Sequence, residues 1–426
     1  MLRSRAGGVC ALLRSRAFGT VARDGSERAA TKGTEEVWIK RRPLPTATSI
    51  EYAIPTDAYL LAQKFQQVVR SGKLDDAVAI VMQTKTRHQS AVVWNLVIGE
   101  YAKTGRLSRA LRAYTEMRKR GFKPTQTTFT ALLKACALSD SDKRTGMAEH
   151  LLASMADHGV EPSIINHNAL LDVYQRQHDL ANLMDRFNGL PSDGPGAPSL
   201  ATYTIMLAAC RRELQRQLAE MGKVPVEGDA TLKPPPVDSR HAALVKGNVR
   251  VAFTALMELW TTYTEDACRR IDQPCVNTPR LEIDSHIVRT VLKACHAIYG
   301  ENRSLGRRGI AIAEQVYGFD KDLGAAAAAP VRALALAPLA VRLRSGSKGA
   351  AIESAVVDSD VIDLVFGLCK RDKQYTKAIR FWRSLEAHFP AEIEPLREQH
   401  AERLGDLRSQ MRIALPQRKS AADTLE

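Results

Sequence analysis

The sequence lacks a continuous run of about 20 apolar residues, the length that a membrane-spanning helix needs. Its most apolar stretch, residues 323–343, is interrupted by Pro330, Arg332, Pro338 and Arg342. A protein that crosses a membrane through helices is therefore not expected. Aromatic residues make up only 6% of the 426 residues, yet hydrophobic residues reach 45%. This apolar content offsets the entropy of chain ordering, which excludes intrinsic disorder as the main state.

Sequence signatures of catalysis are missing as well. No Cys-x-x-Cys pair is present for a zinc ribbon or a redox site, so the zinc-deaminase combination of His-x-Glu with a following Cys-x-x-Cys does not occur either. The phosphate loop Gly-x-x-x-x-Gly-Lys-Ser/Thr and the nucleophile elbow Gly-x-Ser-x-Gly are absent. Asp358, Asp360 and Asp363 cluster, but their spacing favours a helix N-terminus over a metal site. We expect no catalytic residue, no metal, no cofactor and no enzymatic activity.

Positive charge is in excess, and part of it lies at the N-terminus. Lys and Arg number 61 against 47 Asp and Glu, for a net charge of +14, which favours a nucleic acid or an acidic surface as partner. Residues 1–23 contain several Arg and Ser but no acidic residue, the composition of a mitochondrial transit peptide. The alternative is a basic tail without structure. We expect import into the mitochondrial matrix with cleavage after about Phe18, a compartment that suits reduced cysteines.

Similar segments recur along the chain. Lys103 to Ala110 resembles Arg70 to Ala77, and Ala131 to Cys136 resembles Thr290 to Cys295. Alignment of such segments defines one equivalent site in each unit, the frame position, at Ala62, Asn95, Thr130, Asn168, Thr204, Arg289 and Asp363. The first four intervals are 33, 35, 38 and 36 residues. Such a period is typical of a helical repeat array.

Four of the seven cysteines occupy one position of this repeat, six residues after the frame position. They are Cys136, Cys210, Cys295 and Cys369, and Val68, Tyr101 and Tyr174 take the same position in the other units. Apolar side chains at one phase of a repeat predict packing between helices. We expect these cysteines to be buried and to have no chemical role.

Each repeat is predicted to form two helices. In the second repeat one apolar stripe is formed by Val93, Leu96, Val97 and Tyr101. Another stripe, after Gly105, is formed by Leu107, Ala110, Leu111, Tyr114 and Met117. Gly121 ends the second helix and Pro124 prevents its continuation. Since neither helix can bury its apolar face alone, neighbouring units must stack. The predicted fold is all-α, an α-solenoid of stacked helix-turn-helix repeats.

The chain divides into four predicted parts. They are the transit peptide, an irregular lead-in, the solenoid, and a C-terminal helix with its tail, at residues 1–23, 24–55, 56–393 and 394–426. The solenoid contains insertions at about 213–247 and 321–357, and whether 301–357 hides one degenerate repeat stays open. The C-terminal helix is amphipathic, so it either caps the last repeat or docks a partner.

The second repeat carries the residues by which the array resembles a known family. Val92 to Ile98 opens the unit, Lys103-Thr104-Gly105 forms its turn, and Gly121-x-x-Pro124-Thr125 closes it. Together these residues resemble the pentatricopeptide repeat family over residues 58–199, and residues 200–390 resemble it more weakly. Tetratricopeptide repeats share the hairpin and a similar period. The opening Val-x-Trp/Tyr-Asn and the ending Gly-x-x-Pro-Thr/Ser favour the pentatricopeptide repeat.

The resemblance implies that the solenoid binds single-stranded RNA, one base per repeat. In the family the frame residue and the last residue of the same repeat contact the base, and Asn tends to read pyrimidines and Thr purines. Asn amides and Thr hydroxyls both donate and accept hydrogen bonds, which suits that role. Carried over, the base-reading pairs are Asn95 with Thr125, Thr130 with Ser163, Asn168 with Ser199 and, if the residues between are an insertion, Thr204 with Asp284. Ala62, Arg289 and Asp363 lie outside the usual code.

Two further sets of residues are candidates for contacts with RNA. The resemblance implies that bases stack on side chains three residues before the frame position, namely Val92, Thr127, Ile165 and Ala201, with ordinary surface packing as the alternative. Cations recur four or eight residues after the frame position, where a stacked array places them along one surface facing successive phosphates. These phosphate-contacting candidates are Arg70, Lys103, Lys134, Arg176, Arg212, Lys293 and Arg371. A solvated charged face is the alternative.

The function that we predict is binding of a single-stranded mitochondrial transcript or ribosomal RNA precursor. The resemblance implies a role in RNA maturation, stability or translation, including 5′-end processing of small-subunit ribosomal RNA and assembly of the mitochondrial ribosome with its small-subunit proteins. The rival interpretation is a scaffold solenoid that binds protein partners or stays in the mitochondrial ribosome. The degenerate second half of the array favours some contact with protein.

Overall fold

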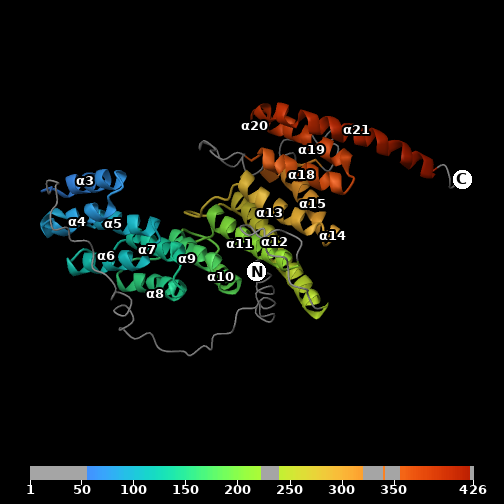
Figure 1. Cartoon of the computed structure of the whole chain (residues 1–426). Helices are drawn as coiled ribbons and strands as arrows, with labels where there is room; N and C mark the ends of the chain where they lie inside the picture. Colours follow the sequence, from blue (N-terminus) through green and yellow to red (C-terminus); the bar gives the residue numbers. More distant parts are fainter. Residues whose placement is uncertain (1–54, 222–238, 320–338, 341–355, 423–426) are drawn as a thin grey trace. The chain divides into compact units, whose positions relative to one another are not determined.

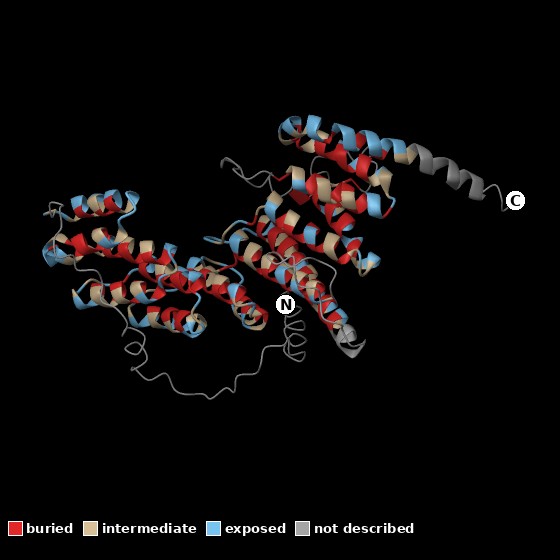
Figure 2. Cartoon of the chain, viewed as in Figure 1, coloured by how far each residue is buried: buried red, intermediate tan, exposed pale blue. Residues whose placement is uncertain are grey.

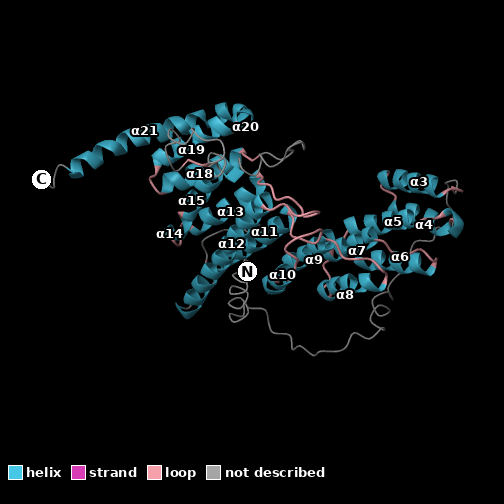
Figure 3. Cartoon of the chain, turned by 180° about the vertical axis from the view of Figure 1, so that it is seen from behind, coloured by secondary structure: helices cyan, strands magenta, loops and turns pink. Residues whose placement is uncertain are grey.

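The computed structural model describes residues 55–221, 239–319, 339–340 and 356–422, and every regular element in these ranges is a helix (Figures 1 and 3). None of these helices combines the length and the apolarity that a bilayer span requires. The chain forms two compact units, with the boundary between Pro198 and Ser199. The predicted transit peptide, the lead-in up to residue 54 and most of segment 321–357 lie outside the described residues.

The first unit, residues 55–198, consists of four successive helix pairs. They are α3 (Ala58–Arg70) with α4 (Leu74–Gln83), α5 (Ala91–Lys103) with α6 (Leu107–Lys119), α7 (Gln126–Leu138) with α8 (Arg144–Asp157), and α9 (Ile164–Arg176) with α10 (Leu180–Asn188). A short 3₁₀ turn, η1 (Thr86–His88), precedes α5. The first helices stack in chain order, since α5 packs against α3 and α7, and α7 packs against α9 (Figure 1). The unit is therefore a helical solenoid, as predicted.

The pair α5 and α6 shows how the sequence produces one hairpin. Ser90 caps α5 by accepting a hydrogen bond from the Val93 amide. Gly105 makes the turn with a φ of +66°, a left-handed conformation that costs other residues free energy. The predicted stripes are buried except for the half-buried Leu96, namely Val93, Val97 and Tyr101 on α5 and Leu107, Ala110, Leu111, Tyr114 and Met117 on α6.

The apolar core of the first unit runs between neighbouring hairpins. Buried side chains line the inner faces of α5, α7 and α9, while exposed residues lie on the outer turns (Figure 2). The α7 helix contacts α5, α6, α8 and α9, which explains why so many of its residues are buried. Each fully buried Val, Leu or Phe contributes about 1.5–3 kcal/mol, so a hairpin without its neighbours would lose most of its stabilisation.

The second unit begins at Ser199 and continues the pattern of first and second helices. It contains α11 (Leu200–Glu220), α12 (Ser239–Asp272), α13 (Ser285–Ile298), α14 (Arg303–Gly306), α15 (Arg308–Tyr317), α18 (Ser359–Arg371), α19 (Tyr375–His388), α20 (Pro390–Ile393), η3 (Glu394–Leu396) and α21 (Arg397–Ala422). The first helices are α11, α13 and α18, and α13 packs against both of the others. Thr204, Arg289 and Asp363 lie on these three helices, so the frame positions keep their place in the fold.

The hairpin of α11 and α12 is longer than the other hairpins. These helices have 21 and 34 residues, against 13 in α5 and α7. Residues 213–220 continue α11, and residues 239–247 begin α12, while 222–238 lie outside the described residues. Leu214 and Leu218 are buried where α11 faces α12. The described parts of the predicted insertion at 213–247 therefore lengthen one hairpin.

The C-terminal helix α21 covers the end of the second unit. It packs against α19 and buries Leu404 and Leu407. His400 is only 1% exposed, and its imidazole lies 3.1 Å from the Ser359 hydroxyl at the start of α18. Arg403 forms an ion pair with the frame residue Asp363. The described part of this helix occupies a capping position on the last repeat.

The turn at Gly105 offers a test of the stacking. A Cβ added to Gly105 would lie 2.7 Å from the Leu138 carbonyl oxygen of the next repeat, closer than real Cβ contacts. Gly159 has a similar φ of +67° but no atom within 4 Å of the added Cβ, so it is the matched control. We expect Gly159→Ala to cost about 1–2 kcal/mol from backbone strain alone. Gly105→Ala should cost about 1–3 kcal/mol more because of the clash.

Urea unfolding of both variants measures this difference in the free energy of unfolding. Equal losses in Gly105→Ala and Gly159→Ala would contradict the close approach of neighbouring hairpins at this turn.

Candidate nucleic-acid interface

The structure explains why a frame residue meets the last residue of its own repeat. Frame residues lie in the middle of the first helices and are half-buried, and the last residues Thr125, Ser163 and Ser199 are the N-caps of α7, α9 and α11. Because α5 packs against α7 and α7 packs against α9, the N-terminus of α7 lies beside Asn95 and that of α9 lies beside Thr130.

In the first predicted pair, Asn95 and Thr125 are joined through a third residue, the fully buried Thr128. The Asn95 Nδ2 donates to Thr125 Oγ1 at 3.1 Å, and Thr128 Oγ1 donates to Asn95 Oδ1 at 2.5 Å. The two threonine hydroxyl oxygens are 3.2 Å apart. Since the Thr128 hydrogen is used on Asn95, Thr125 is the donor in that contact. The three side chains thus close a ring of hydrogen bonds.

The second predicted pair, Thr130 and Ser163, is linked through the fully buried Asn166. The Asn166 Nδ2 donates to Thr130 Oγ1 at 2.9 Å, and Ser163 Oγ donates to Asn166 Oδ1 at 2.9 Å. The Ser163 amide also donates to Asn166 Oδ1 at 3.1 Å, which caps α9. Here too the reading pair is held by the third residue of the next helix.

Sequence reasoning missed Thr128 and Asn166. Both residues stand three positions after an N-cap, at the spacing of a capping box. That spacing is visible in the sequence, but it predicts a local helix cap. The contact with a frame residue 33 or 36 positions earlier follows only from the packing of two repeats.

The structure does not establish the other two predicted pairs. Asn168 belongs to the first unit and Ser199 to the second, so their pairing stays a prediction. Thr204 Oγ1 donates to the Leu200 carbonyl at 2.9 Å, and Asp284 accepts from the Ile287 amide at 2.8 Å as the N-cap of α13. Neither residue hydrogen-bonds the other.

The stacking candidates are all exposed. Val92 is 62% exposed and Ile165 is 58% exposed, which is unusual for large apolar side chains, while Thr127 and Ala201 offer less surface. Tyr59 is 69% exposed and stands three residues before Ala62, at the same position of the first repeat. The repeat spacing predicts this position, although Ala62 at the frame position lies outside the usual code. The first unit therefore presents Tyr59, Val92 and Ile165 at one phase.

The seven phosphate candidates are exposed, but they differ in their ion pairs. Lys103 lies 2.6 Å from Glu100, and Arg176 lies 3.0 Å from Asp172. Arg371 donates to the His296 carbonyl at 3.2 Å. By contrast, Arg70, Lys134 and Arg212 form no ion pair with any described residue. No described carboxylate competes with a polyanion for these three cations.

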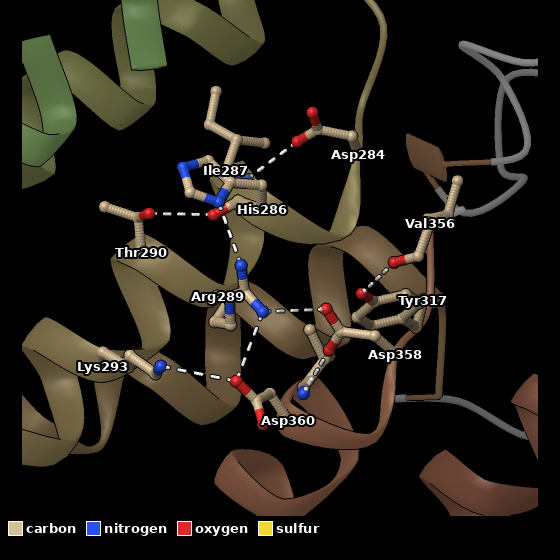
Figure 4. A network of polar contacts seen from close by, with 11 residues as sticks. Asp284, His286, Ile287, Arg289, Thr290, Lys293, Tyr317, Val356, Asp358 and Asp360 are labelled. Atoms are coloured by element: carbon tan, nitrogen blue, oxygen red, sulfur yellow. Dashed lines mark hydrogen bonds and ion pairs between the residues drawn. The ribbon is translucent and has the colours of Figure 1, made fainter. Parts of the chain in front are cut away.

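In the second unit, charged residues occupy the frame position and the N-cap of the next first helix, and they pair with each other (Figure 4). Arg289 Nη1 lies 3.4 Å from Asp358, the N-cap of α18, and 3.3 Å from Asp360. Asp360 also pairs with the phosphate candidate Lys293 at 3.4 Å. The Arg289 Nη2 contacts His286 Nδ1 at 3.0 Å. Two cations and two carboxylates neutralise each other at this repeat, which leaves little charge for a phosphate.

The repeated cysteines are packing residues, as the spacing predicts. Cys136, Cys210, Cys295 and Cys369 are fully buried, and burial raises the pKa of each thiol to about 12. At neutral pH they are therefore thiols and not reactive thiolates. Among the described residues no group of three or more His, Cys, Asp and Glu is arranged to hold a metal ion.

Differential alkylation tests this burial. We expect iodoacetamide at neutral pH to label the exposed Cys275 in the native protein and to spare Cys136, Cys210, Cys295 and Cys369 until the chain is unfolded. Peptide mass spectrometry assigns each site. Native labelling of these four residues as fast as Cys275 would show that they are accessible thiolates.

Two family models match this chain. The PPR repeat family matches residues 89–137, and the pentatricopeptide repeat domain matches residues 150–213. These ranges contain the residues of both hydrogen-bond networks, Asn95–Thr125–Thr128 and Thr130–Asn166–Ser163.

Curated relatives from Arabidopsis thaliana are similar over part of the chain. A putative pentatricopeptide repeat-containing protein is 27% identical over 169 residues, 39% of this chain and 21% of its own length. A chloroplastic relative is 34% identical over 171 residues, 40% of this chain and 16% of its own length. A mitochondrial relative is 27% identical over 145 residues, 33% of this chain and 21% of its own length. The chain thus matches about a fifth of the length of these relatives.

Among solved structures, the chain is similar to the pentatricopeptide repeat protein PPR10 in complex with an 18-nt psaJ RNA element. The identity is 16% and the TM-score 0.31, with 84% of this chain and 54% of that chain covered. The structure of PPR10 from maize gives 14% identity and a TM-score of 0.28, over 85% of this chain and 59% of that chain.

Proposed function

We propose that this chain, which is a pentatricopeptide repeat protein, binds single-stranded RNA along the first helices of its first unit. The observation that carries the proposal is the pair of preformed polar sites on neighbouring repeats. Asn95 with Thr125 and Thr130 with Ser163 each lie at a half-exposed position with their hydrogen bonds already ordered. A preordered site spends less free energy on fixing its side chains when a ligand binds.

The surroundings of these polar sites suit a nucleobase. Val92 and Ile165 expose apolar surface three residues before Asn95 and Asn168, and a base can stack on such surface. Thr127 and Ala201 hold the same place beside Thr130 and Thr204, with smaller contact areas. The proposed reading order follows the chain, with Asn95, Thr130 and Asn168 on successive first helices. One base per repeat is the mode of recognition that such arrays use.

The cations supply the part of the affinity that does not depend on sequence. Lys134 on α7 is exposed and has no ion pair with any described residue, and Arg70 and Arg212 share this property. Lys103 and Arg176 face acidic neighbours, so an RNA phosphate must compete with Glu100 and Asp172 for them. We therefore assign the larger electrostatic contribution to Lys134 and Arg70.

The cellular role that we propose is RNA maturation, stability or translation in the mitochondrial matrix, carried out by binding without catalysis. The Arg-rich, acid-free residues 1–23 support the compartment. The similar relatives include both mitochondrial and chloroplastic proteins. Processing of the 5′ end of small-subunit ribosomal RNA, with small-subunit proteins of the mitochondrial ribosome as partners, is the specific form of this proposal.

A second candidate function is the binding of protein partners by the second unit. The ion pairs of Arg289 with Asp358 and Asp360 favour it, because they occupy the atoms that would read a base. The pairing of Asp363 with Arg403 has the same effect on the last repeat. In this form the first unit holds RNA and the second unit holds protein.

Substitution of one cation on each face tests the RNA-binding proposal. We expect Lys134→Ala to weaken binding to all single-stranded RNAs alike and to reduce the slope of log affinity against log salt by about 0.7–1. Lys119→Ala is the control, since Lys119 is exposed on the second helix α6. Fluorescence anisotropy with a randomised single-stranded RNA pool over a salt series measures both. Equal effects of the two substitutions, or no RNA binding at all, would refute the proposed face.

A further inference from the structure

We infer that the buried third residue of the following helix decides whether a reading pair offers the base a hydrogen-bond donor or acceptors. Thr128 has this role for Asn95, and Asn166 has it for Thr130. Both are positioning residues that touch the reading residue and lie beneath it, fully buried. The inference rests on the proposed function, since it concerns how the same sites select bases.

At the first pair the distances fix the orientation of the Asn95 amide. The 2.5 Å contact with Thr128 Oγ1 fits an O–H···O bond and is too short for an N–H···O bond, whereas the 3.1 Å contact with Thr125 Oγ1 fits an N–H donor. The Asn95 carbonyl therefore faces the buried threonine. The second N–H of the amide has no partner among the described residues, and Asn95 is half-buried with an accessible side. This pair offers the base a donor.

At the second pair both hydroxyl hydrogens are already used inside the protein. Thr130 Oγ1 donates to the Gln126 carbonyl at 2.9 Å and accepts the Asn166 amide hydrogen at 2.9 Å. Ser163 Oγ donates to Asn166 Oδ1 at 2.9 Å. A hydroxyl has one hydrogen and two lone pairs, so only lone pairs remain available on Thr130 and Ser163. This pair offers the base acceptors alone.

The two pairs should therefore differ in how much affinity they lose for bases that carry no hydrogen-bond donor on their pairing edge. Unsubstituted purine lacks the 6-amino group of adenine, and pyrimidin-2-one lacks the 4-amino group of cytosine. An acceptor-only site loses its hydrogen bond when adenine is replaced by purine. A donor site keeps its bond to the ring nitrogen or carbonyl when cytosine is replaced by pyrimidin-2-one.

The chain itself provides a precedent for an apolar residue at this position. Val93 is the third residue of α5 and is fully buried, in a repeat whose preceding frame residue is Ala62. A valine is thus compatible with the local packing. Thr128→Val frees the Asn95 carbonyl, and Asn166→Val frees the Ser163 hydroxyl hydrogen.

The experiment uses the full chain and an RNA selected by it from a randomised pool. Adenine is replaced by purine opposite Thr130, and cytosine by pyrimidin-2-one opposite Asn95, in RNAs scanned one position at a time. In the unsubstituted protein we expect about a tenfold loss for purine, the cost of one unpaired group, and about equal binding of the two pyrimidines. Asn166→Val should raise the affinity for the purine-substituted RNA about threefold to tenfold, because the freed Ser163 hydroxyl can donate to the purine ring nitrogen. Thr128→Val should raise the preference for cytosine to about threefold to tenfold.

Both variants are predicted to gain a contact, Thr128→Val with cytosine and Asn166→Val with purine, which general destabilisation cannot imitate. Thr128→Ser keeps the hydroxyl and should restore the ratio of the unsubstituted protein. Ser163→Ala keeps Asn166 and therefore the acceptor-only state of Thr130, so it should keep the tenfold purine loss even if Asn166→Val does not fold. The inference would be overturned by an unchanged cytosine ratio in a folded Thr128→Val, by an unchanged affinity for purine in a folded Asn166→Val, or by loss of the preference in Ser163→Ala. Failure to select any RNA would instead refute the proposed function.

Discussion

The lateral packing of first helices is the constraint on which the rest of the structure depends. A hairpin such as α5 with α6 has an apolar face that only the next hairpin can cover, so α5, α7 and α9 must lie side by side. This packing brings the N-termini of α7 and α9 next to the middle of the preceding first helix. The cap of one helix and the frame residue of another thereby form a single polar site. In this fold the residues that we propose to read bases also take part in helix capping.

The same geometry serves different chemistry in the two units. In the first unit the sites consist of Asn, Thr and Ser, whose uncharged groups remain available at a half-buried position. In the second unit Arg289 and Asp358 take the equivalent places and pair with each other. A base would have to break this ion pair to reach either side chain. The helical repeat is therefore kept along the chain, while the uncharged polar sites that we propose to read bases lie in its first unit.

Much of the fold could be predicted from the sequence because each signal is local. The spacing of Val93, Val97 and Tyr101 predicts a helix with one buried face, and Gly105 predicts the turn that follows. The period then predicts that Asn95 and Thr125 belong to one site. The extension of α11 and α12 was less predictable, because the segment around Pro234 interrupts the pattern between them and looks like a linker.

The parts of the candidate site that the sequence does not predict depend on contacts between repeats. Thr128 looks like an ordinary helix cap until α5 is placed beside α7, when its hydroxyl reaches Asn95. The ion pair of Arg289 with Asp360 joins residues 71 positions apart, and no period of the sequence contains it. The orientation of an amide is likewise a property of three side chains at once. Such contacts follow only from the packed structure, even when every residue concerned is known from the sequence.

The most direct test of the central claim is ultraviolet crosslinking of the protein to RNA in cells, with sequencing of the RNA and mass spectrometry of the crosslinked peptides. The claim predicts one discrete single-stranded footprint, with crosslinks on the first helices α5, α7 and α9. Crosslinked peptides confined to the second helices, or the absence of any discrete footprint, would contradict it.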